Sequence, residues 1–172
     1  MKQIRKLKGI FKIPKLLRKD LKDQKVQTIL LQTVYPEIVA YLKNKLNKEG
    51  TIQILRNMGK NVAKTISKEW IPKGKNLKEM AREVFEFIFD NKSIKFKKDE
   101  EGNLLVIDPE CRLCTEGLEV SEINYCEIIS SALEGFVNIV RETYVYFPKA
   151  SITTVSSKAS GAKNCIHVIK IL

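Results

Sequence analysis

The sequence predicts an α+β fold in which N-terminal helices and one long packed helix lie against an antiparallel β-sheet. Two observations predict it. Apolar residues recur at helical spacing in the first half of the chain and again over 121–142, whereas residues 93–108 and 150–171 follow strand-like patterns. The resulting order is helices, hairpin, helix, hairpin, without the strand–helix–strand repeat of a parallel sheet. The 172 residues fit a single domain with a sizeable core.

The first elements are helical. Residues 26–35 are apolar and compatible with helix or strand, and Pro36 is typical of the first turn of the helix that follows. We expect that helix to end at Gly50. A second helix is predicted over 52–68, with an apolar stripe of Ile52, Leu55, Met58, Val62 and Ile66. Its interior Gly59 costs about 1 kcal/mol relative to Ala, so we infer that another helix or a ligand approaches that backbone.

The later elements follow from capping residues and turns. Asn76 can cap a helix over 77–91, whose inward residues would be Met80, Val84, Phe87 and Ile88. A hairpin of strands 93–97 and 104–108 turns at 99–103. Ser121 can cap the helix 121–142, which has the clearest apolar stripe: Cys126, Ile129, Leu133, Phe136, Val137 and Val140. Two closing strands, 150–157 and 165–171, flank a turn that contains Gly161.

The net charge of +11 is unevenly distributed along the chain. Residues 1–98 carry +16, residues 99–142 carry −9, and the remainder carries +4. Residues 1–25 form a basic arm, which either lies on an anionic membrane or docks its few apolar side chains on the domain formed by 26–172. Most basic residues are Lys rather than the Arg that specific readers of bases favour, and a Lys- and Glu-rich surface with one His also suits a thermophile.

Several protein classes are excluded by missing motifs. No apolar run approaches the length that spans a bilayer, and no signal-peptide pattern is present, so we expect a cytoplasmic protein. The chain has one His, no P-loop and no G-x-G-x-x-G motif. We therefore expect a non-enzymatic protein, with no candidate catalytic residues.

The four cysteines are the candidate metal ligands. Cys111 and Cys114 form a C-x2-C pair directly after a predicted strand, a spacing that directs two thiolates toward one zinc ion. Cys126 lies near the start of the long helix and Cys165 opens the last strand, with His167 on the same face as a substitute ligand or a second-shell group. Such a complete site would be structural zinc. Buried thiols, a disulfide and a redox pair remain as alternatives.

Three stretches of the chain resemble the 4-vinyl reductase-like small-molecule-binding domain family. They are residues 55–62, with Gly59 inside a helix; the C-x2-C pair and the long helix with its Ser131–Phe136 segment; and residues 157–168. The last stretch is similar to the family's C-x3-G-x3-C motif, but Ser157 stands where the family has its first cysteine.

The resemblance implies a fold similar to the palmitate-binding subunits of the TRAPP vesicle-tethering complex, a homodimer, and a bound hydrocarbon-like small molecule. The glycine-containing helices agree with an apolar channel, for which the candidate lining residues are Leu55, Met58, Gly59, Val62, Leu133, Phe136 and Val137. Close packing of the two helices through Gly59 and Gly135 is the alternative. The second candidate function is that of a zinc-containing nucleic-acid-binding protein that uses the basic N-terminal half. The third is an enzyme that acts on a tetrapyrrole-like substrate, which would need a cofactor site that the sequence does not show.

Overall fold

The computed structural model describes residues 30–114, 123–144 and 146–172. Its sheet has four strands in the order β1-β2-β4-β3, and every neighbouring pair is antiparallel. The strands are β1 (Lys95–Lys98), β2 (Leu104–Asp108), β3 (Ala150–Ser156) and β4 (Cys165–Ile171). The predicted α+β class with an antiparallel sheet is confirmed. The predicted basic arm, residues 1–25, lies outside the described residues.

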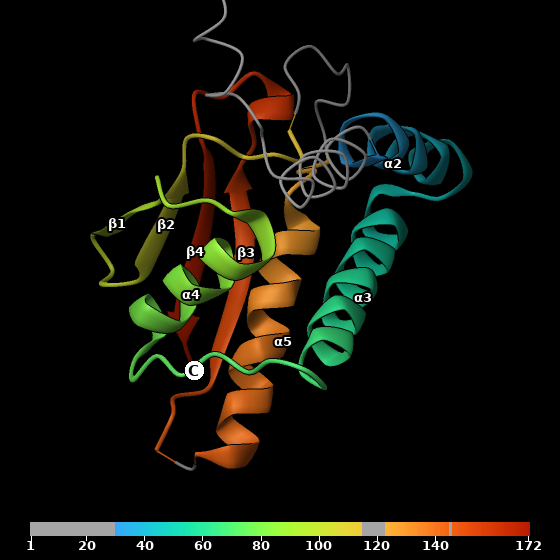
Figure 1. Ribbon diagram of the computed structural model, residues 1–172. Coiled ribbons are helices and arrows are strands. Elements are labelled where there is room, and N and C mark those ends of the chain that lie inside the picture. The colour runs from blue at the N-terminus through green and yellow to red at the C-terminus, as the bar shows by residue number, and fades with distance from the viewer. Residues whose placement is uncertain (1–29, 115–122, 145) are drawn as a thin grey trace, which may run out of the picture.

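The helices cover one face of this sheet (Figure 1). A π-helical turn (Leu30–Val34) leads into α2 (Tyr35–Lys45), and α3 (Lys48–Ile66), α4 (Leu77–Phe89) and α5 (Glu127–Thr143) follow. His167 of β4 contacts the ring of Phe85 in α4 and the hydroxyl of Ser130 in α5, so α4 and α5 pack on the same side of the sheet. Helix α3 runs alongside α5 and forms an outer layer (Figure 1). None of the helices in the described part of the chain is long and apolar enough to cross a membrane.

Three details of the helices differ from the sequence prediction. Helix α5 begins at Glu127 and not at residue 121, so Cys126 immediately precedes the helix. Helix α2 ends at Lys45, and Gly50 lies inside the first turn of α3, because the Asn47 side chain accepts the Gly50 N–H and begins the new helix. In α4 it is Phe85, not Phe87, that turns into the core: Phe87 is 55% exposed and stacks on Trp70. Asn76 caps α4 as predicted, whereas Ser121 lies outside the described residues.

Glycines set the close approach of α3 and α5. A Cβ built on Gly59 would overlap Ser131 Oγ and the Ile128 carbonyl oxygen, and would lie 2.8 Å from the Ala132 nitrogen. A Cβ on Gly135 would lie 2.7 Å from the Cβ of Ala63. The two helices therefore touch through their backbones at these points, which is the helix-packing alternative of the sequence prediction.

An ion cluster ties the helices to the edge strand β3. The Arg56 guanidinium of α3 pairs with Glu127 and Glu134 of α5 and donates to the Ile152 carbonyl oxygen. The same two carboxylates accept the N–H groups of Thr154 and Ile152 at 3.0 Å. Backbone groups of an edge strand that would otherwise face water are thus paired with side chains of α3 and α5.

Candidate metal centre and ligand pocket

Four cysteines from distant parts of the chain meet at one end of the sheet. Cys111 and Cys114 lie in the loop after β2, Cys126 immediately precedes α5, and Cys165 is the first residue of β4. The pairing of Asp108 with Cys165 places the end of β2 beside the start of β4, which brings the C-x2-C loop to Cys165. All four Sγ atoms lie within 4.8 Å of one another, and all four side chains are buried.

Three of the sulfur–sulfur separations are somewhat shorter than those around one tetrahedral metal ion. The Sγ of Cys126 lies 2.7 Å from that of Cys114, 3.1 Å from that of Cys165 and 3.4 Å from that of Cys111. A tetrahedral ion with sulfur bonds of about 2.3 Å holds its sulfurs about 3.8 Å apart. Small side-chain shifts would therefore let one ion bond all four cysteines, and the four thiols are a donor set that fits a metal ion.

The protonation of the cluster depends on its own members. Burial, followed by hydrogen bonds with the other thiols, raises the pKa of Cys126 well above its usual value. Hydrogen bonds from Cys111, Cys126 and Cys165 lower the pKa of the Cys114 thiol. Negative charge is therefore favoured on one sulfur and disfavoured on its neighbour, and four thiolates could share this site only around a cation.

Polar groups around the cluster fix its geometry. Ser157 Oγ lies 3.3 Å from the Sγ of Cys114, and the Lys158 N–H donates to the Sγ of Cys165 at 3.3 Å. The serine that departs from the family pattern therefore stands within the cluster. The Asp108 carboxylate accepts from the Asn91 amide at 2.8 Å and orients the chain into the C-x2-C loop, and burial raises its pKa.

His167 is placed beside a hydroxyl pair rather than among the four sulfurs. Its Nδ1 lies 2.9 Å from Ser130 Oγ and 3.3 Å from Thr154 Oγ1. Burial lowers the pKa of the imidazole to about 4, and its Nε2 has no partner within the described ranges. Among the described residues, the four cysteines lie close enough to hold one metal ion, and His167 does not belong to this group.

The seven lining residues predicted from the sequence occupy different places. Four of them are fully buried in the core, namely Leu55, Leu133, Phe136 and Val137. Gly59 packs against the backbone of α5. Met58 and Val62 line a shallow hollow of about 400 Å³ on the outer surface of α3, together with Ile66 and Ile128.

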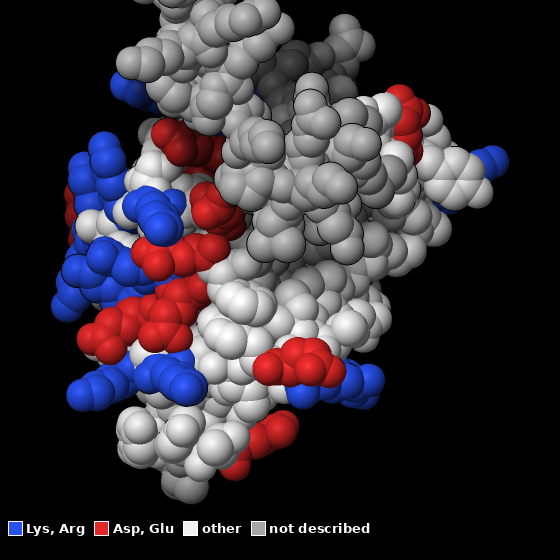
Figure 2. Space-filling view, in the orientation of Figure 1, with Lys and Arg blue, Asp and Glu red and all other residues white. Residues whose placement is uncertain are grey.

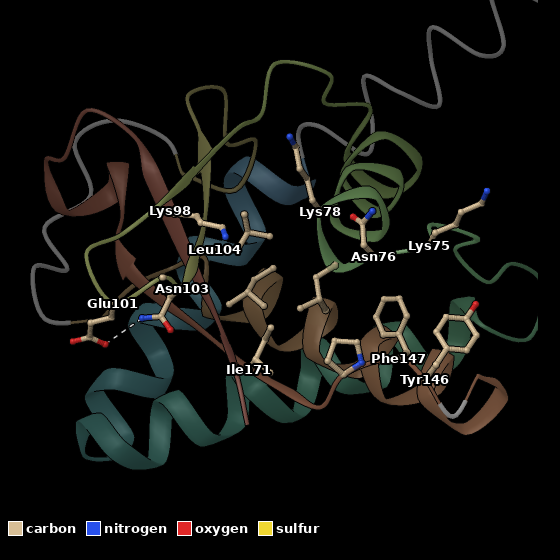
Figure 3. Close-up of a pocket in the computed structure, with 14 residues that line it drawn as sticks. Lys75, Asn76, Lys78, Lys98, Glu101, Asn103, Leu104, Tyr146, Phe147 and Ile171 are labelled. Atoms are coloured by element: carbon tan, nitrogen blue, oxygen red, sulfur yellow. Dashed lines mark hydrogen bonds between the residues drawn. The ribbon is translucent and has the colours of Figure 1, made fainter.

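A deeper pocket of about 550 Å³ lies at the other end of the sheet, between the start of α4, the β1–β2 hairpin and residues 146–148 (Figure 3). Its apolar wall is contributed by residues of α4, β2, β4 and the segment before β3: Leu77, Leu104, Phe147, Pro148, Ile169 and Ile171. Lys75, Lys78 and Lys98 stand at its rim, with Glu101 as the acidic residue. Such a pocket can accept an apolar ligand with one polar end.

The residues of this pocket are not among those predicted from the sequence. The one available signal was the apolar run Tyr146-Phe147-Pro148 in a connecting segment, where solvent-exposed polar residues are more common. The pocket is formed only when this segment, the hairpin and α4 are brought together by the sheet.

Comparison with known proteins supports the fold. No family model matches the chain, and no curated protein matches it in sequence. Among solved structures, the chain is similar to the crystal structure of a trafficking protein particle complex subunit 3 from Naegleria fowleri covalently bound to palmitic acid. The TM-score is 0.59 at 15% sequence identity, and the match covers 86% of this chain and 96% of that chain. At this identity the likeness concerns the fold, and it confirms the predicted TRAPP-subunit-like architecture.

Proposed function

We propose that this chain is a non-enzymatic domain that binds a hydrophobic small molecule and is stabilised by a structural zinc ion, as a member of the 4-vinyl reductase-like family. The observation that carries the ligand proposal is the pocket between α4 and the β1–β2 hairpin, with its apolar wall of Leu104, Phe147 and Ile169. The palmitic acid held by a protein of the same fold supports the class of ligand. No cysteine lines this pocket, and all four cysteines of the chain lie in the cluster. A ligand here would therefore be held without a bond to sulfur.

The ligand proposal has two candidate locations, which a pair of matched variants separates. Leu104→Trp fills the pocket at the hairpin, and Val62→Trp fills the hollow on α3 that includes two of the residues predicted from the sequence. We expect an apolar fluorescent probe to bind the wild type and Val62→Trp equally and to bind Leu104→Trp several-fold more weakly. The opposite order would assign the ligand to α3, and the absence of probe binding to all three proteins would contradict the proposed function. Circular dichroism checks that each variant is folded.

The zinc proposal rests on the four-sulfur cluster. Cys111, Cys114, Cys126 and Cys165 would hold the ion and close its coordination, so that its chemistry is to cross-link the loop, α5 and β4. Binding of structural zinc is worth about 10 kcal/mol or more in apparent free energy, which is comparable with the stability of a domain.

Elemental analysis of the purified protein tests this site. We expect one zinc per chain in the wild type and in Ser157→Ala, because the serine is not a ligand in this proposal. Cys114→Ser should lose the ion and unfold at lower denaturant concentration. Metal-free protein whose four thiols titrate freely after unfolding would favour the buried-thiol alternative, and protein with fewer free thiols would favour the disulfide or redox alternatives.

The homodimer implied by the family resemblance stays a prediction, and α2 offers a surface for it. Two residues of the π-helical turn and two of α2 are apolar, follow a 3-4-3 spacing and are each between 36% and 62% exposed: Leu31, Val34, Ile38 and Tyr41. The helix is acidic in its first turn and basic in its last turn. Two copies packed antiparallel would therefore pair opposite charges while burying both sets of apolar residues.

The nucleic-acid alternative is not favoured. Figure 2 shows Lys and Arg side chains interleaved with Asp and Glu over the region of α4 and β1, without a continuous basic groove on the face in view. The most basic segment, residues 1–25, lies outside the described residues.

A further inference from the structure

The pocket at the hairpin combines an apolar interior with a basic rim (Figure 3). Phe147 and Ile169 are almost completely buried at its base, whereas Lys75, Lys78 and Lys98 are exposed at its edge. The close-up places Lys98 beside Leu104, while Lys78 and Lys75 extend outward from the start of α4. A ligand that enters the pocket would pass close to Lys98, with Lys75 and Lys78 farther out at the rim.

None of these three ammonium groups forms an ion pair in the described residues, although the Glu79 carboxylate lies near Lys75 and accepts its backbone N–H. The ion pairs of the described residues involve Arg56, Lys60 and Arg112. The carboxylate of Glu101, the acidic residue of the rim, accepts a hydrogen bond from Asn103 instead. The rim therefore carries an excess of two positive charges.

The ammonium group of one rim lysine, Lys78, lies near an aromatic ring. The Lys78 ammonium lies 5.6 Å from the centre of the Phe96 ring, and the Arg82 guanidinium lies 5.5 Å from the same ring. Both cations are attracted to the ring face, which keeps a further positive charge near Lys78 at this end of α4. An anion at the rim would gain from all of these charges, which are exposed and therefore screened by salt.

We infer that the pocket selects an anionic single-chain amphiphile, with its acyl chain over Leu104, Phe147 and Ile169 and its charged head group between the rim lysines. This inference rests on the proposed function and adds the chemical class of the ligand. The orientation follows from solvation: a charged head group is too costly to bury in the apolar base, whereas the rim offers it water and three ammonium groups.

Binding of dodecanoate, dodecanol and dodecyltrimethylammonium, each below its micelle concentration, tests the inference. We expect the carboxylate to displace an apolar probe at a concentration about tenfold lower than the alcohol, because the rim has an excess of two positive charges and each exposed charge contact is worth about a factor of three. The cationic amphiphile should bind most weakly. The preference should shrink as salt is raised from 20 to 500 mM, since the contacts are exposed.

Two triple variants locate the effect. Lys75→Gln/Lys78→Gln/Lys98→Gln should bind alcohol as the wild type does and lose the preference for the carboxylate. Lys64→Gln/Lys68→Gln/Lys163→Gln removes the same charge from exposed positions outside the pocket and should keep the preference. Equal binding of alcohol and carboxylate by the wild type, or a preference that survives in the rim variant, would overturn the inference while leaving the proposed function standing. Failure of all three amphiphiles to bind would overturn both.

Discussion

The double substitution Gly135→Ala/Ala63→Gly, which moves one methyl group from α3 to α5, should leave the free energy of unfolding nearly unchanged. Each single substitution should lower it. Gly135→Ala places a Cβ 2.7 Å from the Cβ of Ala63, about 1 Å inside the optimal separation of two carbon atoms. Overpacking of this kind costs about 1–3 kcal/mol, and the better helix propensity of Ala returns about 1 kcal/mol. We expect a net loss of about 1 kcal/mol, within a range of about 0–2 kcal/mol.

The second half of the exchange removes the opposing methyl group. Ala63→Gly loses about 1 kcal/mol of helix propensity and about 0.8 kcal/mol of buried apolar surface. In the double variant the methyl of residue 135 occupies the space that Ala63 leaves, since the next atoms near a Gly135 Cβ, both from Lys60, are at 3.5 and 3.7 Å. One Ala and one Gly remain at the contact, so the double variant should lie within about 1 kcal/mol of the wild type, whereas additive effects would give about 3 kcal/mol.

Urea denaturation of the four proteins, followed by circular dichroism at fixed metal content, measures this coupling. Gly59→Ala is the matched comparison, because its Cβ would meet the backbone of Ile128 and Ala132, which no side-chain substitution can remove. We expect Gly59→Ala to destabilise the protein more than Gly135→Ala does. Strictly additive losses for Gly135→Ala and Ala63→Gly would show that the helices do not touch at these residues, and would refute the reasoning.

Three further predictions concern the ion cluster, the exposed apolar residues at α2 and the α4 cap. Arg56→Met should cost about 3 kcal/mol or more in urea denaturation because two largely buried carboxylates lose their partner, whereas Arg112→Met, whose ion pair is exposed, should cost less than about 1 kcal/mol. Burial raises the pKa of Glu134, but the Ile152 N–H and Arg56 outweigh burial and lower it. The ionised carboxylate therefore stabilises the fold above about pH 4.3, the ordinary pKa of Glu, and this contribution is lost as the pH falls further. Acid unfolding of Arg56→Met should depend less on this carboxylate. Ile38→Glu should convert a dimer to a monomer in light scattering without changing the circular dichroism spectrum, and a wild type that is monomeric at high concentration would remove the basis for this surface. Asn76→Ala should lower the free energy of unfolding in urea by about 1 kcal/mol, since the Asn76 side chain accepts the Glu79 N–H at the start of α4. A loss no larger than that of the exposed Asn57→Ala would show that the cap contributes nothing.

Periodicity was enough to predict the class of the fold and the identity of its main elements. The stripe of α5 is long and unbroken, so its helix was found, and the two hairpins were found from alternation and turn residues. The ends of the elements are harder to predict, because they depend on single hydrogen bonds. Gly50 is typical of the end of a helix, but the Asn47 side chain accepts its N–H and places it in the first turn of α3. The sequence predicts that Phe87 faces the core, whereas Phe85, two positions earlier on α4, is the buried residue. Only the packing of α4 on the sheet decides which of the two is buried.

The candidate metal site and the ligand pocket could also be predicted only in part from the sequence. The C-x2-C pair could be found locally, but its closure by Cys165 depends on the pairing of β2 with β4, which brings residues far apart in sequence to one end of the sheet. The ligand-lining residues predicted from the glycine-containing helices stay a prediction, since a glycine indicates only that something approaches the backbone. At Gly59 and Gly135 that neighbour is the other helix.

The sheet register gives the uneven charge of the chain a structural meaning. Leu104 pairs with Ile169 at the pocket end and Asp108 pairs with Cys165 at the cluster end, so both sites share strands β2 and β4 and lie at their opposite ends. The acidic segment 99–142 supplies three of the four cysteines, and a zinc ion with four thiolates would add a net charge of −2 there. The three rim lysines belong instead to the basic segment that ends at Lys98. With zinc bound, the cysteine end of these strands would gain negative charge, whereas the pocket end combines the three rim lysines with the acidic turn residues Asp99, Glu100 and Glu101. A preference of the pocket for an anion would therefore depend on the position of the lysines at the rim and not on the charge of the whole end of the sheet.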